Sequence, residues 1–247
     1  MRKTWTMKEV AAHWDSVPEY DDINKGIDSY FRRFTDSAPL FSIPKDAKVL
    51  DIDCRTAKGT CFFKERYTTA QFTCGAMSPT FRTRALAQLE KSGCAANVFV
   101  FEGLPLPFEN GHFDAVLTYE TLEHTPWPDR FIAELSRVLK PGGLLVLTTP
   151  NVLWEPVHWF SATFHLDHGE GPHRMVPRGE IYRAFAQANL RVEQERSFVL
   201  IPVGPKWLLK FGKWMERILP ERALRILCLR RTFICRKYEL VRANTPE

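Results

Sequence analysis

Short apolar runs alternate with amphipathic stretches along most of this chain, and residues 113–151 show the pattern most clearly. The apolar run 115–118 is followed by an amphipathic stretch, 130–139, and then by a second apolar run, 144–148. Apolar positions in 130–139 recur at helical spacing, and the KPGG cluster after them predicts the end of that helix. Continuous apolar runs are typical of parallel strands with both faces covered. The segment is therefore predicted to be a strand–helix–strand unit with a right-handed crossover.

The same stretch carries a family resemblance. Residues 113–124 (FDAVLTYETLEH) and 130–151 (RFIAELSRVLKPGGLLVLTTPN) resemble the second half of class I S-adenosylmethionine-dependent methyltransferases, particularly the methyltransferase type 11 group. Residues 173–192 resemble that group again, so the resemblance extends from residue 49 to residue 198. It implies an α/β fold: a Rossmann-like, doubly wound, mostly parallel seven-stranded sheet with helices on both faces and an antiparallel last strand.

A single domain is expected, because 247 residues with 45% hydrophobic and 26% charged positions suit one sizeable core. We divide this methyltransferase-like domain into an N-terminal helical cap (1–44), a Rossmann-like core (45–200), a basic amphipathic helical insertion (205–230) and a last strand (232–239). In the family, such a cap closes over the cleft and contributes to substrate selection. The alternative is a helix that only covers the sheet edge.

The loop 53–60, after the predicted strand 48–52, is where a doubly wound fold binds its ligand. The resemblance implies S-adenosylmethionine there, held by an acidic residue and three alternate glycines. The acid is Asp51, but the glycine positions carry Asp53, Arg55 and Ala57. The other expected cofactor-binding residues of this loop are Cys54, Thr56 and Gly59.

Two interpretations of this altered loop follow. Each replacement adds a Cβ that can obstruct the ligand and disfavours positive φ. In the functional interpretation, Asp53 and Arg55 bind the ammonium and carboxylate of the cofactor's methionine end through charge-assisted contacts. In the other, the loop has lost its ligand and the chain is a catalytically silent scaffold. The complementary charge pair favours function.

The resemblance also places cofactor contacts after the next strands, 71–75 and 97–101. Ala76 stands where most of the family has an acid for the ribose hydroxyls, and Ser78 is either a substitute or only the N-cap of the following helix. The remaining cofactor-binding positions are Met77, Glu102, Gly103, Tyr119 and Glu120.

Histidines supply the candidate catalytic groups, since five of the seven lie between His124 and His173. A histidine beside the methyl donor could remove a proton from an acceptor hydroxyl, and we select His158, His173 and His124 in that order. Each could equally order a polar surface loop. The spacing matches no compact zinc signature, so no metal is expected.

Residues 206–219 predict a basic amphipathic helix. An apolar face is formed by Trp207, Leu208, Phe211, Trp214, Met215 and Ile218, and the opposite face by Lys206, Lys210, Lys213 and Arg217. The pattern fits docking on an anionic membrane surface. The alternatives are a lid packed on the core or a homodimer contact.

Charge and cysteine content add little constraint. A net charge of +5 permits an anionic partner without requiring one, and no nucleic-acid motif is visible. The six cysteines form no CxxC pair, and no secretory segment is apparent, so a cytoplasmic location with optional membrane association is expected.

The predicted activity is methyl transfer from S-adenosylmethionine to a small-molecule or lipid-like acceptor, achieved mainly by positioning. The alternative is a catalytically silent binding or membrane-surface protein with a degenerate cofactor loop.

Overall fold

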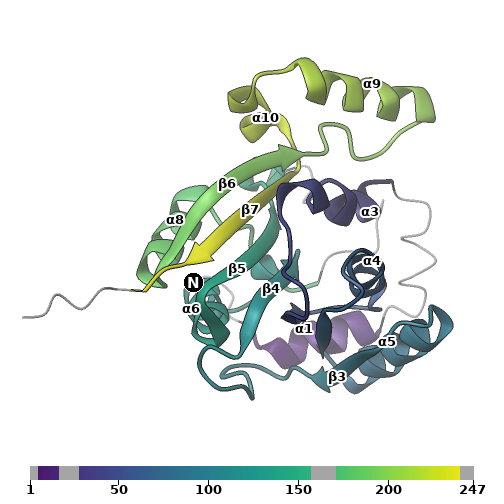
Figure 1. Cartoon of the computed structure of the whole chain (residues 1–247). Helices are drawn as coiled ribbons and strands as arrows, with labels where there is room; N and C mark the ends of the chain where they lie inside the picture. Colours follow the sequence, from purple (N-terminus) through teal and green to yellow (C-terminus); the bar gives the residue numbers. More distant parts are fainter. Residues whose placement is uncertain (1–4, 17–27, 157–170, 240–247) are drawn as a thin grey trace, which may run out of the picture.

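The computed structural model describes residues 5–16, 28–156 and 171–239. Its centre is one seven-stranded sheet in the order β3-β2-β1-β4-β5-β7-β6. All neighbouring strands are parallel except β7, which runs antiparallel to β5 and β6 (Figure 1). The strands are β1 (Lys48–Ile52), β2 (Gln71–Ala76), β3 (Ala96–Val100), β4 (Phe113–Tyr119), β5 (Leu139–Pro150), β6 (Leu190–Phe198) and β7 (Arg230–Lys237). The predicted fold class is confirmed.

Helices cover both faces of this sheet (Figure 1). Helices α6 and α8 pack together on one face, whereas α4 and α5 contact each other on the other face, with α3 beside α4. The helices are α1 (Met7–Asp15), α3 (Asp28–Thr35), α4 (Lys58–Arg66), α5 (Pro79–Lys91), α6 (Pro128–Val138), α8 (Arg178–Gln187), α9 (Lys206–Ile218) and α10 (Glu221–Leu227). Short 3₁₀ turns lie at Ala38–Leu40, Leu122–His124 and Val152–Trp154.

Aromatic side chains join these layers. On one face, the rings of Phe63 in α4 and Tyr119 in β4 are stacked with centroids 5.8 Å apart. On the other, Phe185 of α8 meets Phe233 of β7 edge to face at 5.4 Å. Such pairs bury large apolar surfaces and hold the helices in fixed positions over the strands. Helix α4 is thereby held against β4 and helix α8 against β7.

The KPGG cluster behaves differently from the sequence prediction. Helix α6 ends at Val138, and strand β5 begins at the next residue, so residues 140–143 lie inside the strand. The pairing register shifts from Phe113↔Leu139 to Ala115↔Leu144, and Gly142 has φ 74°. Three extra residues of β5 thus form an irregularity against β4, which glycine tolerates because it has no Cβ.

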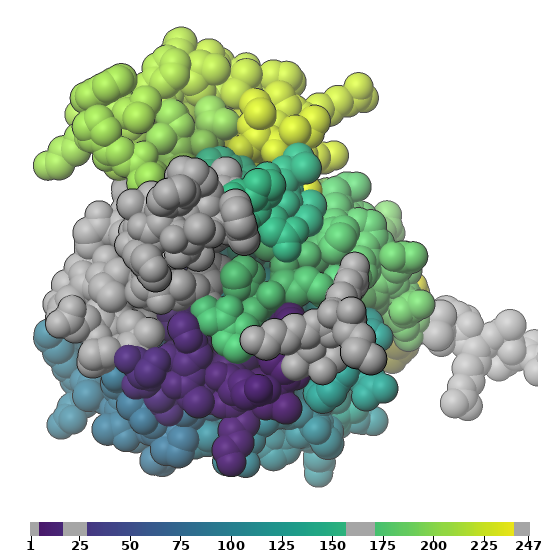
Figure 2. Space-filling model, turned by 180° about the vertical axis from the view of Figure 1, so that it is seen from behind, coloured from purple at the N-terminus to yellow at the C-terminus, as the bar shows by residue number. Residues whose placement is uncertain are grey.

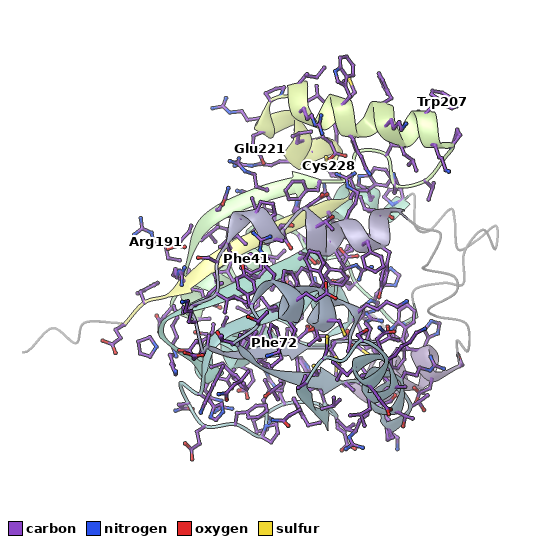
Figure 3. The ribbon with its side chains drawn as sticks, turned by 45° about the vertical axis from the view of Figure 1, so that its right-hand side comes forward. Phe41, Phe72, Arg191, Trp207, Glu221 and Cys228 are labelled. Atoms are coloured by element: carbon purple, nitrogen blue, oxygen red, sulfur yellow. The ribbon has the colours of Figure 1, made fainter. Side chains whose placement is uncertain are left out.

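The surface of helix α9 divides into an inner side, an exposed apolar side and a basic side, whereas the sequence predicted only an apolar face and an opposite basic face. Its inner side carries Gly212, where an added Cβ would lie 3.0 Å from the Ile201 side chain, and Glu216, which binds Arg32 of α3. The side chains of Trp207, Phe211, Trp214 and Ile218 are exposed, and Trp207 lies at the outer end of the helix (Figure 3). The lysines therefore do not lie opposite these apolar side chains, where the sequence predicted them, because the opposite side of the helix packs on the body of the protein.

No helix in the described ranges combines the length and the apolar character needed to cross a bilayer.

Candidate active site

Strand order reverses beside β1, which lies between β2 and β4. Ligands of doubly wound sheets bind at such a point, outside the carboxyl ends of the strands. The loops after β1, β2 and β4 converge there, and helix α1 lies across them. Figure 2 shows α1 in purple on the face that also carries the green segment after residue 170. Helix α1 thus contacts the loops after β1, β2 and β4 through Trp14 and Asp15.

The loop after β1 keeps the backbone that glycine would adopt. Asp53, Arg55 and Ala57 have φ values of 58°, 51° and 58°. These are the three alternate positions where the family has glycine. A non-glycine residue in the left-handed region costs on the order of 1 kcal/mol or more, so the surrounding contacts must hold the loop in this shape.

The contacts that hold it centre on an ion pair between Asp53 and Arg55. Arg55 Nε lies 2.9 Å from Asp53 Oδ2, and the two side chains are almost fully buried. Arg55 also donates to the backbone oxygen of Glu120 at 3.2 Å, and its guanidinium stacks 4.6 Å from the ring of Trp14 in α1. Asp53 and Arg55 thus pair with each other, and Arg55 joins the loop to helix α1.

The two carboxylate oxygens of Asp53 differ in their hydrogen bonds. Thr121 Oγ1 donates to Oδ2 at 3.3 Å, whereas the buried Oδ1 has no hydrogen-bond partner. Burial raises the pKa of this carboxyl, and the nearby Arg55 and the Thr121 hydrogen bond oppose that shift. An orphaned, buried carboxylate oxygen is costly and is suited to an ammonium donor.

Asp51, the predicted acid, is also buried. Thr60 Oγ1 donates to its Oδ2 at 2.5 Å. Burial raises the pKa of Asp51 to about 7, against the Thr60 hydrogen bond, and the neighbouring Asp53 adds to the rise. Its neighbours Cys54 and Thr56 are buried, and Cys54 Sγ lies 3.8 Å from the Arg55 backbone oxygen. Gly59 serves packing instead, since a Cβ there would lie 2.6 Å from Phe34 of α3.

The positions expected to hold the ribose and adenine line a hollow beside α1. Its volume is about 430 Å³, and its walls include Met77, Ser78 and Glu102. Ser78 accepts from Phe81 N as the N-cap of α5 and donates to Asp15 of α1 at 2.6 Å. Of the two roles that the sequence left open for Ser78, the structure shows the N-cap, and the same hydroxyl also joins α5 to α1. Gly103, at φ 154°, lies in the adjoining loop.

Tyr119 and Glu120 end β4 but face the cap helix α3 and strand β7. The Tyr119 hydroxyl lies 3.1 Å from Ser37 Oγ, and burial raises its pKa well above the usual value. Glu120, at φ 57°, forms a two-point ion pair with Arg230 of β7. Their side chains therefore anchor the cap, and Glu120 reaches the cofactor loop through its backbone oxygen.

The structure brings two of the three candidate bases together. His124 and His173 have ring centroids 6.1 Å apart. His124 Nδ1 lies 3.2 Å from the Pro172 backbone oxygen, and His173 Nδ1 lies 2.9 Å from that of Gly171. His124 is buried beside Trp14, whereas His173 is partly exposed. His158 lies outside the described residues.

Sequence reasoning missed Trp14 and Thr121 as members of this site. It also missed a buried cation on β7: Arg231 donates to Asn151 Oδ1 at 2.6 Å, while its Nε and second terminal nitrogen have no partner. Burial lowers the pKa of this guanidinium. Arg231 precedes the strand predicted at 232–239, so no pattern in the sequence pointed to it.

Within the described part of the chain, no group of three His, Cys, Asp or Glu side chains could hold a metal ion. All six cysteines are free thiols.

Comparison with known proteins agrees with this geometry. A profile of the family described as "Methyltransferase domain" matches residues 50–147. A ubiquinone/menaquinone biosynthesis C-methyltransferase from Psychromonas ingrahamii is 32% identical over 61% of this chain and 60% of its own length. The chloroplastic tocopherol O-methyltransferase of Arabidopsis thaliana is 33% identical over 42% of this chain and 30% of its own length. The chain thus matches less than two thirds of either relative.

Solved structures share the fold. A chain from the complex of the Haloferax volcanii Trm112 methyltransferase activator with a methyltransferase has a TM-score of 0.70 at 16% identity, covering 94% of this chain and 98% of that chain. The [4+2]-cyclase SpnF has a TM-score of 0.61 at 16% identity, covering 84% of this chain and 80% of that chain. Residues 50–147 thus match the methyltransferase-domain family that the sequence resembles, and the described chain shares its fold with these solved structures.

Proposed function

We propose that this chain is an S-adenosylmethionine-dependent methyltransferase acting on a small-molecule or lipid-like acceptor. The observation that carries the proposal is the loop after β1, whose three non-glycine residues keep the glycine backbone and place a buried charge pair there. When bound, S-adenosylmethionine supplies an electrophilic methyl group. Named relatives that act on quinones and tocopherol support the acceptor class.

The residues present fit the methionine end of this cofactor. The unpartnered Asp53 Oδ1 is an acceptor for its ammonium, and the Arg55 guanidinium is a donor for its carboxylate. Met77 and Glu102 line the hollow available to its ribose and adenine. Arg55 now stacks on Trp14, so cofactor binding would exchange that contact for one with the ligand.

His173 is the better placed of the two described bases. A carbonyl oxygen only accepts, so Nδ1 of His173 donates to Gly171 and leaves Nε2 as the basic nitrogen. His124 has the same arrangement but is buried under α1. His173 would thus remove the acceptor proton, and His124 would position it. Positioning supplies most of the rate in such a reaction, so replacing His173 should slow the reaction without abolishing it.

A catalytically silent scaffold is the second candidate function. In that case the stack of Arg55 on Trp14 blocks the cleft permanently. The cyclase SpnF shows that this fold is not restricted to proteins named as methyltransferases.

One experiment separates the two. Calorimetry would measure the binding of S-adenosylmethionine and S-adenosylhomocysteine to the wild type and to Asp53→Gly/Arg55→Gly, which restores the family glycines. If the charge pair holds the cofactor, the double variant should bind at least about 10-fold more weakly. If the stack of Arg55 on Trp14 instead blocks the cleft, the double variant should bind the cofactor more tightly than the wild type, or bind it where the wild type does not. Asp46→Gly is the matched control, since Asp46 has φ 57° on an exposed turn far from the cleft.

A further inference from the structure

The outer surface of α9 presents its apolar side chains to solvent. Exposed fractions are 69% for Trp207, 48% for Phe211, 52% for Trp214 and 55% for Ile218. At about 100° per residue, these four positions lie within roughly 60° of one another. They form one continuous row, here called the aromatic stripe. An amphipathic helix that belongs to a core buries such a row, and this helix does the opposite.

Polar anchoring on the inner side explains why the stripe points outward. Glu216 receives two hydrogen bonds from the Arg32 guanidinium of α3 and one from the backbone nitrogen of Leu200 at 2.8 Å. Gly212 lets the helix approach Ile201 closely. Turning the stripe inward would break the buried ion pair and remove the close contact. The outward orientation is therefore a property of the fold.

Positive charge borders the stripe. Lys206, Lys210 and Arg217 are exposed and form a basic row beside it, whereas Lys213 lines the hollow shared with Arg32 and Glu216. The only acid of α9, Glu216, is paired with Arg32 on the inner side. Glu221 of α10 is paired with Arg196 at 3.0 Å. Ile226 and Leu227 of α10 add further exposed apolar surface. The outer surface of α9 is thus both apolar and positive.

We propose that this surface docks on an anionic lipid bilayer, with the aromatic stripe in the interface and the basic row on lipid phosphates and carboxylates. Aromatic rings and lysines are the side chains that interfacial helices use for these two contacts. A second copy of the chain fits less well, because a two-fold contact through the stripe would bring two basic rows together. The inference is independent of the proposed methyl transfer.

Docking through α9 would also set the position of the cleft relative to a lipid-like acceptor in the bilayer. Helix α9 is bonded to α3 through Arg32, and α3 is bonded through Arg33 and Glu120 to the end of β4, at the cleft. Docking through α9 would hold the cleft at a fixed distance and tilt relative to the bilayer.

Co-sedimentation with large vesicles tests the proposal with the full chain. We expect wild-type protein to bind vesicles of 70% phosphatidylcholine and 30% phosphatidylserine, and to bind pure phosphatidylcholine at least about 10-fold more weakly. Lys206→Glu/Lys210→Glu should lose at least about 10-fold on the anionic vesicles. Trp207→Ser/Trp214→Ser should lose a similar factor and also the fluorescence quenching that brominated lipids cause in the wild type.

Matched controls keep the test specific. Lys45→Glu/Lys91→Glu makes the same charge change at exposed positions elsewhere, and Leu86→Ser removes an exposed apolar side chain of α5. Both should bind like the wild type, and near-ultraviolet circular dichroism would confirm that every variant is folded. Equal binding by the wild type and the α9 variants would overturn the proposal. A dimer in sedimentation velocity that Trp207→Ser/Trp214→Ser dissociates would assign the stripe to a second copy instead.

Discussion

At Asp51 the fold changes a protonation equilibrium, and this gives a pH dependence that can be measured. Its folded pKa of about 7 lies above the unfolded value of 3.8. Between those values the folded state binds more protons than the unfolded state, so the free energy of unfolding should fall as pH rises from 4 to 7 and level off above 7. The loss should be on the order of 4 kcal/mol if the full shift is expressed.

Urea denaturation at pH values from 4 to 8 would measure this effect. Asp51→Asn keeps an oxygen for Thr60 but cannot titrate, so its stability should depend less on pH. Asp53 also has a raised pKa and contributes a slope of the same sign, which the variant retains. Identical slopes in the wild type and Asp51→Asn would contradict the assignment.

Local sequence was sufficient to identify Asp51, Asp53 and Arg55, because they stand at fixed positions after a strand. It could not identify Trp14, which stacks on Arg55 from a helix forty residues earlier, or Thr121, which bonds to Asp53 from the turn after β4. Such partners are set by how distant elements pack. The same limit applies to Arg231 of β7, which lies between β5 and β6.

Among the elements, α4 shows how a residue expected to bind cofactor can serve packing. Gly59→Ala would place a methyl group against the Phe34 ring, which cannot move freely because it packs edge to face with Phe63. We expect a loss of about 1–3 kcal/mol in the free energy of unfolding.

The control is Gly179→Ala, in the first turn of α8, where an added Cβ meets nothing within 4 Å. Higher helix propensity should make that variant up to about 1 kcal/mol more stable. Chemical denaturation of both would check the pair. A loss at Gly59 no larger than the change at Gly179 would show that α3 adjusts without cost.

Hydrophobic periodicity predicted where helices and strands lie along the chain with small errors. It did not predict which side of a helix faces the core. Strand β1 has the predicted bounds, and the helix predicted at 206–219 is present. The side of α9 that faces inward is decided by Glu216 and its distant partner Arg32, so periodicity alone left its orientation open. An ion pair between residues 184 positions apart leaves no local signal.

For the whole molecule, that ion pair joins the cap at one end of the sequence to helix α9 near the other. The side chains of Arg32 and Glu216 are about 90% buried, so removing one charge leaves the other poorly solvated. Glu216→Gln should therefore destabilise the protein by on the order of 2 kcal/mol. It should also raise amide hydrogen exchange in both α3 and α9, while α6 and α8 keep their protection.

Glu193→Gln is the matched control, because its partner Arg236 is exposed and such pairs contribute less than about 1 kcal/mol. Faster exchange confined to α9 would show that the contacts of α3 with Tyr119, Glu120 and Arg230 hold the cap without Arg32, and that α9 and the cleft are not linked through this ion pair.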